Sequence, residues 1–237
     1  MFQFIGSPEF DGQGKIVLGT AEGGVQVTLF RLNELDLDHI YVNQDEPFRA
    51  KAKLPLDLNY WYFHTMHHEF CHILTQKKYY STDFQTISAG KYHSTDWINV
   101  EDEDAVKEGF VTGYASGEYN EDFAEVYANY VTSSDESWKA RLDKGIEYTV
   151  TGLNAKGETI QVAFWGKPTN AQLAGAGFAS VKGAKITSRE GANIINAKLE
   201  IVRSYLQDNW GIDLEKLRAI VLRRSAEVMN MDLTTLN

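Results

Sequence analysis

The sequence NYWYFHTMHHEFCHILTQ, residues 59–76, decides the fold and contains the motif H-E-x-x-H at residues 68–72. It has no glycine or proline, and its apolar residues recur at mixed three- and four-residue spacing, so a helix is predicted. Residues four apart share a helix face, so His68 and His72 can direct two ring nitrogens at one ion. Glu69 lies about 100° further round the helix, where it can hold a water molecule bound to that ion but is not itself a ligand. Two ligands beside one base are typical of zinc hydrolases.

The alternative is a core helix whose histidines only satisfy backbone carbonyls. Burying several imidazoles without a metal would need a separate polar partner for each, which makes a shared metal the better interpretation. Cys71 and His67 are also four apart, but no further ligand accompanies them. We therefore expect Cys71 to be a buried thiol.

Length, charge and cysteine content limit the classes of protein to which the chain can belong. The chain has 237 residues, enough for one large domain or two lobes sharing a cleft. A formal charge of −10 argues against a nucleic-acid or anionic-membrane partner. No secretory signal and no apolar run of membrane-spanning length are recognisable, and a single cysteine excludes an intrachain disulfide.

Along the chain, residues 15–18 and 25–32 are rich in β-formers and flank a glycine turn, which predicts a hairpin. A second hairpin is predicted at 148–151 and 159–165, followed by a surface loop around 175–177. Helices are expected at 102–108, 120–132, from 133 onward, at 187–208 and at 213–229. Gly109 should end the first of these helices, and Asn120 and Asp213 should be the N-caps of the second and the last. Irregular structure is expected at 35–58 and 77–100.

A catalytic zinc needs a third protein ligand and an open position for water. The extended motif H-E-x-x-H-x-x-G-x-x-H is excluded, because Thr75 and Lys78 replace its glycine and last histidine. The other known arrangement takes a glutamate from a second helix, followed four residues later by an acid that orients the first histidine. Glu121 and Glu125 fit this pattern, with Glu121 as the ligand, and the sequence also allows the reverse assignment.

Four segments carry a family resemblance: GTAEGG at 19–24, HHEFCHIL at 67–74, NEDFAE at 120–125 and IVLRR at 220–224. With them the chain resembles the glutamate-type zincins. More closely, it resembles the zinc-binding metallopeptidase family of surface lipoproteins found beside outer-membrane nutrient importers in Bacteroidetes-type bacteria. The resemblance implies an α+β, zincin-like fold. A small N-terminal β-sheet or hairpin would pack on the active-site helix, and the C-terminal part would be mainly helical.

The domain prediction combines the sequence pattern with this resemblance. Residues 1–14 are expected to be a lead-in, partly vector-derived if its GSPEF fragment is not native, and residues 15–237 a single zincin-like catalytic domain. Within it, 15–100 would hold the hairpin and the active-site helix, and 101–237 would be a helical lobe. The insert at 148–186 matches nothing in the family.

The resemblance also implies the chemistry. Some glutamate-type zincins place a tyrosine seven residues before the ligand glutamate, where it donates to the oxyanion; Tyr114 has this offset from Glu121. The implied activity is zinc-dependent hydrolysis of peptide bonds. The implied roles are Zn²⁺ ligation by His68, His72 and Glu121, general-base catalysis by Glu69, oxyanion stabilisation by Tyr114, and orientation of His68 by Glu125.

Two other functions use the same residues: a peptide- or glycoprotein-binding protein on a zincin scaffold, and a zinc-dependent hydrolase of non-peptide amides. An intact Glu69 disfavours the first, because a pure binder has no need of a base. By resemblance, the partners would be a peptide or glycoprotein substrate and outer-membrane importer components. The location would be the cell surface or periplasm, as an outer-membrane lipoprotein.

Overall fold

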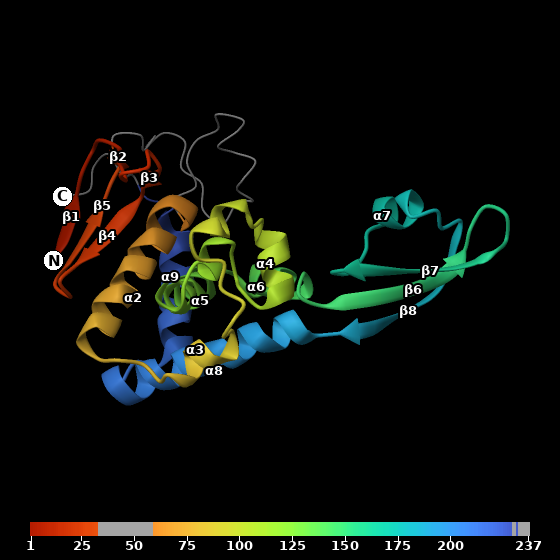
Figure 1. Ribbon diagram of the computed structural model, residues 1–237. Coiled ribbons are helices and arrows are strands. Elements are labelled where there is room, and N and C mark those ends of the chain that lie inside the picture. Colours follow the sequence, from red (N-terminus) through yellow and green to blue (C-terminus); the bar gives the residue numbers. More distant parts are fainter. Residues whose placement is uncertain (33–58, 229–230, 232–237) are drawn as a thin grey trace. The chain divides into compact units, whose positions relative to one another are not determined.

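The computed structural model describes residues 1–32, 59–228 and 231 (Figure 1). Helices and small β-sheets occur together in these residues, which confirms the α+β class. The irregular stretch expected at 35–58 lies outside the described residues. The chain forms two compact units: unit 1 comprises Met1–Ser81, Phe123–Ser134 and Ile201–Asn237, and unit 2 comprises Thr82–Asp122 and Asp135–Glu200.

The main sheet of unit 1 has the order β1-β5-β4. Strand β4 (Gly19–Glu22) pairs antiparallel with β5 (Gln26–Leu29), and β1 (Phe2–Phe4) adds to β5 in parallel. The turn between β4 and β5 uses Gly23 and Gly24 at positive φ, so the predicted hairpin is present with its first strand a few residues later than expected.

The first residues do more than lead into the domain. Besides β1, they contribute β2 (Glu9–Phe10), which pairs antiparallel with β3 (Ile16–Val17) in a separate ribbon. The expected lead-in at 1–14 therefore contains two strands.

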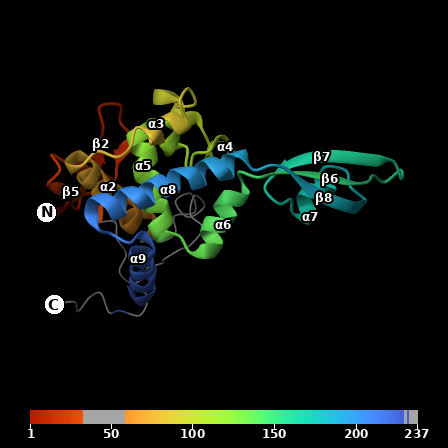
Figure 2. The ribbon, with the colours of Figure 1, turned by 90° about the horizontal axis from the view of Figure 1, so that it is seen from below.

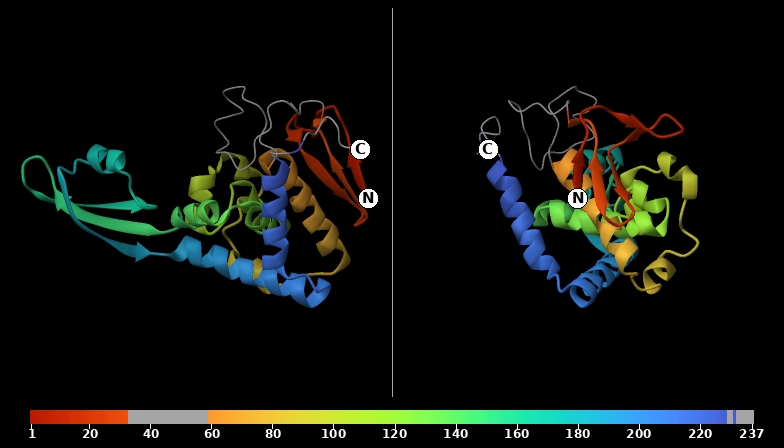
Figure 3. Two further views of the ribbon diagram at one scale, coloured as in Figure 1. Left: turned by 180° about the vertical axis from the view of Figure 1, so that it is seen from behind. Right: turned by 90° about the vertical axis from the view of Figure 1, so that its left-hand side faces the viewer.

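This sheet packs on helix α2 (Thr65–Lys77), which follows a π-helical segment, η2 (Asn59–His64) (Figures 1 and 3). The sheet comes close to the helix at Gly19, where a Cβ atom would lie 2.8 Å from Thr65 Cγ2 and 2.9 Å from Glu69 Cγ. Only glycine fits there without a shift, so the sheet is seated directly on the H-E-x-x-H helix.

Helix α5 (Tyr119–Thr132) is buried along almost its whole length. Its residues up to Asp122 belong to unit 2, and those from Phe123 belong to unit 1. The predicted N-cap at Asn120 is wrong, because Tyr119 is already helical. In unit 1 its C-terminal end is held by Arg218, which donates to the backbone oxygens of Tyr130 at 2.8 Å and Ser133 at 2.7 Å.

Arg218 belongs to α9 (Leu214–Val228), which follows α8 (Glu190–Trp210). The predicted cap of α9 is confirmed, since Asp213 Oδ1 accepts from the amides of Glu215 and Lys216. Helix α8 begins later than the predicted residue 187. No helix among the described residues is long and apolar enough to cross a bilayer.

Unit 2 contains short helices around a buried centre. The predicted helix 102–108 is confirmed as α4 (Asp102–Glu108), ending at Gly109 with φ of 95°. Part of the stretch expected to be irregular, 77–100, is helical. The remaining helical segments are α3 (Asp83–Ile87), η3 (Ser94–Asn99), η4 (Tyr114–Ser116) and α6 (Asp135–Asp143).

The insert of unit 2 is a three-stranded antiparallel sheet of order β7-β6-β8, with α7 lying over one face (Figures 1 and 2). The predicted hairpin is confirmed as β6 (Glu147–Leu153) and β7 (Thr159–Trp165). The loop predicted around 175–177 is present at 176–179. The elements on either side of it, helix α7 (Asn170–Gly175) and strand β8 (Ser180–Ser188), were not predicted. Strand β8 is almost fully exposed and lacks the apolar alternation by which strands are recognised.

Candidate metal centre

The two motif histidines converge on one point. His68 and His72 lie one turn apart on α2, and their Nε2 atoms are 3.1 Å from each other. A tetrahedral zinc site with Zn–N bonds of 2.0–2.1 Å has an edge of about 3.3 Å, so one ion could take both nitrogens with little adjustment. The rings stand nearly perpendicular, at 77°.

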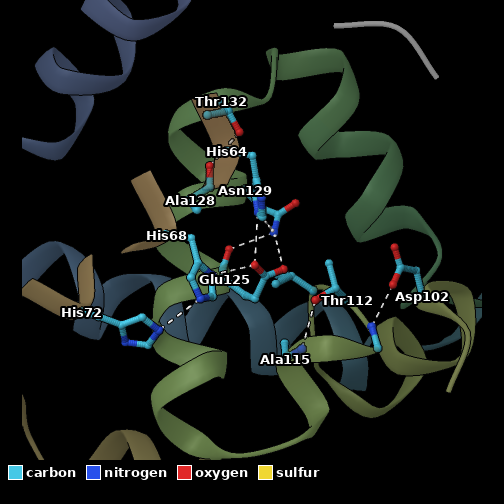
Figure 4. A network of polar contacts seen from close by, with 12 residues as sticks. His64, His68, His72, Asp102, Thr112, Ala115, Glu125, Ala128, Asn129 and Thr132 are labelled. Atoms are coloured by element: carbon cyan, nitrogen blue, oxygen red, sulfur yellow. Dashed lines mark hydrogen bonds and ion pairs between the residues drawn. The ribbon is translucent and has the colours of Figure 1, made fainter. Parts of the chain in front are cut away.

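The second nitrogen of His68 has its own partner. Nδ1 lies 2.8 Å from Oε1 of Glu125, a buried carboxylate on α5 (Figure 4). Because a carboxylate only accepts, the proton of the neutral ring belongs on Nδ1. The lone pair of Nε2 is therefore available to a metal, as in carboxylate–histidine–metal arrangements.

Two further residues surround Glu125. Asn129 donates from Nδ2 to Oε2 at 3.1 Å and to the Glu125 backbone oxygen at 3.0 Å, while His64 Nε2 lies 3.2 Å from Oε1 (Figure 4). Burial raises the pKa of the Glu125 carboxyl. His64 and His68 lower this pKa by more, through their charges and their hydrogen bonds to the carboxylate, so it lies well below its usual value. Glu125 is therefore ionised at neutral pH.

Glu121 lies one turn before Glu125 on α5 and is half-buried. Since α5 is continuous and Glu125 contacts His68, helix geometry carries Glu121 to the histidine pair. One ligand atom from each of His68, His72 and Glu121 lies within 4.8 Å of the other two. Two imidazoles and one carboxylate are the donor set of a catalytic zinc with a free fourth position, so the residues fit this metal.

The predicted catalytic residues are placed as follows. Glu69 is half-buried on α2, and its Cγ faces β4 across Gly19. Tyr114 begins η4 in unit 2, is 38% exposed, and meets the ring of Trp97 edge-on at 4.8 Å between centroids. Glu121 and Glu125 follow it on the next helix.

Sequence reasoning missed His64 and Asn129 as partners of Glu125. The available signal was spacing, since Asn129 follows Glu125 by four residues and His64 precedes His68 by four.

The remaining polar residues of α2 have other surroundings. Cys71 is a buried thiol, as expected. Burial, together with the charge of His64, lowers the pKa of His67 to about 4, and its Nδ1 lies 3.5 Å from the hydroxyl of Tyr127. His67 is therefore neutral at physiological pH.

Comparison with known proteins gives the family. A family model described as "putative zinc-binding metallo-peptidase" matches residues 1–215. The crystal structure of a putative zinc-binding metallo-peptidase from Bacteroides caccae, at 2.10 Å resolution, is 33% identical with a TM-score of 0.59. The match covers 92% of this chain but only 61% of that one. Curated proteins gave no match. On the match over residues 1–215, the chain belongs to the family of putative zinc-binding metallo-peptidases.

Proposed function

We propose that the chain is a zinc-dependent peptidase of the glutamate-zincin type, with Glu69 as its general base. The observation that carries this proposal is the convergence of His68, His72 and Glu121, with the far nitrogen of His68 bonded to Glu125. This arrangement favours Glu121 as the ligand and Glu125 as the orienting acid.

Each residue has a defined task in this proposal. A zinc ion, when bound, supplies Lewis acidity and makes water acidic enough to act as a nucleophile near neutral pH. Glu69, the neighbour of His68, accepts the proton of the attacking water and passes it to the leaving amine. Glu125 keeps His68 in the orientation that presents Nε2.

Tyr114 is proposed to donate its phenolic hydrogen to the developing oxyanion. Such a donor is worth on the order of 3 kcal/mol in the transition state. The support is its offset of seven residues from Glu121 and the seating of its ring against Trp97.

The neighbourhood of Glu69 favours an extended peptide as substrate. Among the described residues β4 pairs with β5 and with no other strand, and Gly19 brings β4 against the Glu69 side chain. A peptide could add to β4 on the side away from β5 by backbone hydrogen bonds. By family resemblance, we also propose that the substrates are peptides or glycoproteins handled beside outer-membrane importer components at the cell surface.

The test compares the parental protein with Glu69→Gln and, as a control for loss of one surface charge, Glu136→Gln. Each is assayed for zinc content and for cleavage of a peptide and glycopeptide library, with and without a chelator. We expect Glu69→Gln to keep its zinc and lose turnover by about 10²–10⁴-fold, and Glu136→Gln to behave as the parent. Cleavage by Glu69→Gln at the parental rate would refute the base assignment. Binding of library members without cleavage by the parent would indicate a recognition protein.

A further inference from the structure

The residue after Glu121 takes part in a buried ion pair. Asp122 Oδ2 lies 2.6 Å from Nζ of Lys198 on α8, and both side chains are completely buried. Both residues belong to unit 2. Burying two charges costs several kcal/mol for each ion, so such a pair is weak support for stability and needs another explanation.

The surroundings hold this Lys198–Asp122 pair in one geometry. Lys198 Nζ also donates to the backbone oxygen of Gly109 at 2.8 Å and lies 4.0 Å from the ring centroid of Phe110. The hydroxyl of Tyr92 donates to Asp122 Oδ2 at 2.9 Å. Asp122 is thus tied directly to Lys198 and Tyr92, and through Lys198 to Gly109.

Asp122 lies in the first turn of α5, and the first turn is where a helix is least constrained. The first four amides of a helix lack intrahelical partners, and its ends fray. Glu121 and Asp122 are adjacent, so their side chains differ by about 100° around the axis. Fixing Asp122 inward therefore fixes the direction in which Glu121 points.

We propose that Lys198 is a positioning residue for the metal centre: through Asp122 it sets the first turn of α5 so that Glu121 is held toward His68 and His72. This inference rests on the zinc site proposed above. Lys198 touches neither metal nor substrate, and its effect on zinc passes through Glu121.

The same helix offers a matched control at its other end. Arg218 is also a buried cation on a C-terminal helix, and it holds the backbone of α5 at Tyr130 and Ser133. Tyr130 is nine residues beyond Glu121, about 13 Å along the helix. Removing Arg218 should loosen the end of α5 that carries no ligand.

The experiment compares the parent with Lys198→Met and Arg218→Met. For each protein, competition with a chromophoric chelator gives the zinc dissociation constant, and unfolding of the zinc-free form gives the midpoint. Both variants should lower the midpoint. Only Lys198→Met should weaken zinc binding, by about 10-fold or more, the range seen for groups that support a metal ligand. Equal zinc constants in parent and Lys198→Met, or equal weakening in both variants, would overturn the inference.

A double-mutant cycle separates positioning from general loosening. In the Glu121→Ala background, Lys198→Met should weaken zinc binding no further, because the residue through which it acts is gone. Further weakening of the same size in that background would refute the proposed route. If Lys198→Met does not fold, Tyr92→Phe replaces it as the test variant. Tyr92→Phe removes one hydrogen bond to Asp122, keeps the ion pair, and should weaken zinc binding a few-fold. An unchanged constant in a folded Tyr92→Phe would then count against the inference.

The outcomes also distinguish the two proposals. A parental protein that binds no zinc would overturn the metal centre and this inference together. A parent that binds zinc only as tightly as Lys198→Met would overturn the inference alone.

Discussion

Glu125 is the acid around which the polar contacts of the metal centre are arranged. It is buried, ionised, and bonded to His68 and Asn129. Its neutral isostere in Glu125→Gln keeps the shape but removes the charge that orients His68. Zinc affinity is expected to fall by about 10–100-fold with the fold retained, as measured by chelator competition.

The Glu125 result also discriminates between the two acids. Glu136→Gln is the control and should bind zinc as the parent does. If Glu125→Gln abolished zinc binding while Glu121→Gln bound zinc normally, Glu125 would be the third ligand and the roles of the two acids would be reversed.

Tyr114→Phe tests the oxyanion role. Loss of the hydroxyl should lower kcat by about 10²-fold, with KM and zinc affinity unchanged, because the bond forms only in the transition state. Tyr119→Phe is a matched control, since both tyrosines are 38% exposed and close in sequence. A Tyr114→Phe enzyme with parental kcat would remove Tyr114 from the mechanism.

At the residue scale, motif spacing predicted that His68 and His72 share one helix face and that Glu121 and Glu125 share another, because residues four apart lie together. The structure brings Glu121 near both histidines and Glu125 to His68. The role of Glu69 stays a prediction. The roles of Asn129 and Lys198 could not be predicted. An amide four residues from an acid is a common pair, and the contact of Lys198 with Asp122 joins residues 76 apart in the chain.

At the scale of single elements, Gly109 shows how a helix stop constrains packing. Its φ of 95° is unfavourable for other residues, and an added Cβ would lie 2.3 Å from Ile194 Cγ2. Gly109→Ala should lower the free energy of unfolding by about 2–4 kcal/mol, combining backbone strain with overpacking. Denaturant titration measures the change.

Gly175→Ala is the matched control. Gly175 is the last residue of α7, and nothing lies within 4 Å of the position a Cβ would take. The substitution should be neutral or slightly stabilising. Equal losses in both variants would show that the position of Ile194 does not determine the cost at Gly109.

Elements were predictable where local chemistry marks their ends. Gly109 and Asp213 bound α4 and α9 as expected, and the β6–β7 hairpin follows from alternating apolar residues. Strand β8 was missed for a physical reason. Strand β8 is stabilised by hydrogen bonds to β6 rather than by burying an apolar face, and such pairing leaves little trace in the sequence.

At the scale of the whole molecule, the described contacts join distant parts of the chain. Unit 1 combines three separate segments, and α5 and α8 each contribute residues to both units. Hydrophobic periodicity identifies helices but carries no information on which distant helices meet, so this interleaving could not be read from the sequence.

Zinc is expected to stabilise the folded protein, because an ion that binds only the native state shifts the unfolding equilibrium. At a free concentration 100 times the dissociation constant, the gain is about 2.7 kcal/mol. Thermal unfolding with zinc and with a chelator measures it, and the chelator should lower the Tm of the parent. The Glu121→Ala variant should show a much smaller difference, and a full-sized difference there would mean that zinc binds elsewhere.

The most direct test of the metal centre is a crystal structure of the zinc-loaded protein with anomalous data collected at the zinc edge. We expect one strong anomalous peak about 2.0–2.2 Å from Nε2 of His68, Nε2 of His72 and a carboxylate oxygen of Glu121. A peak coordinated by Glu125 instead of Glu121, or a peak away from both histidines, would contradict the proposed zinc site.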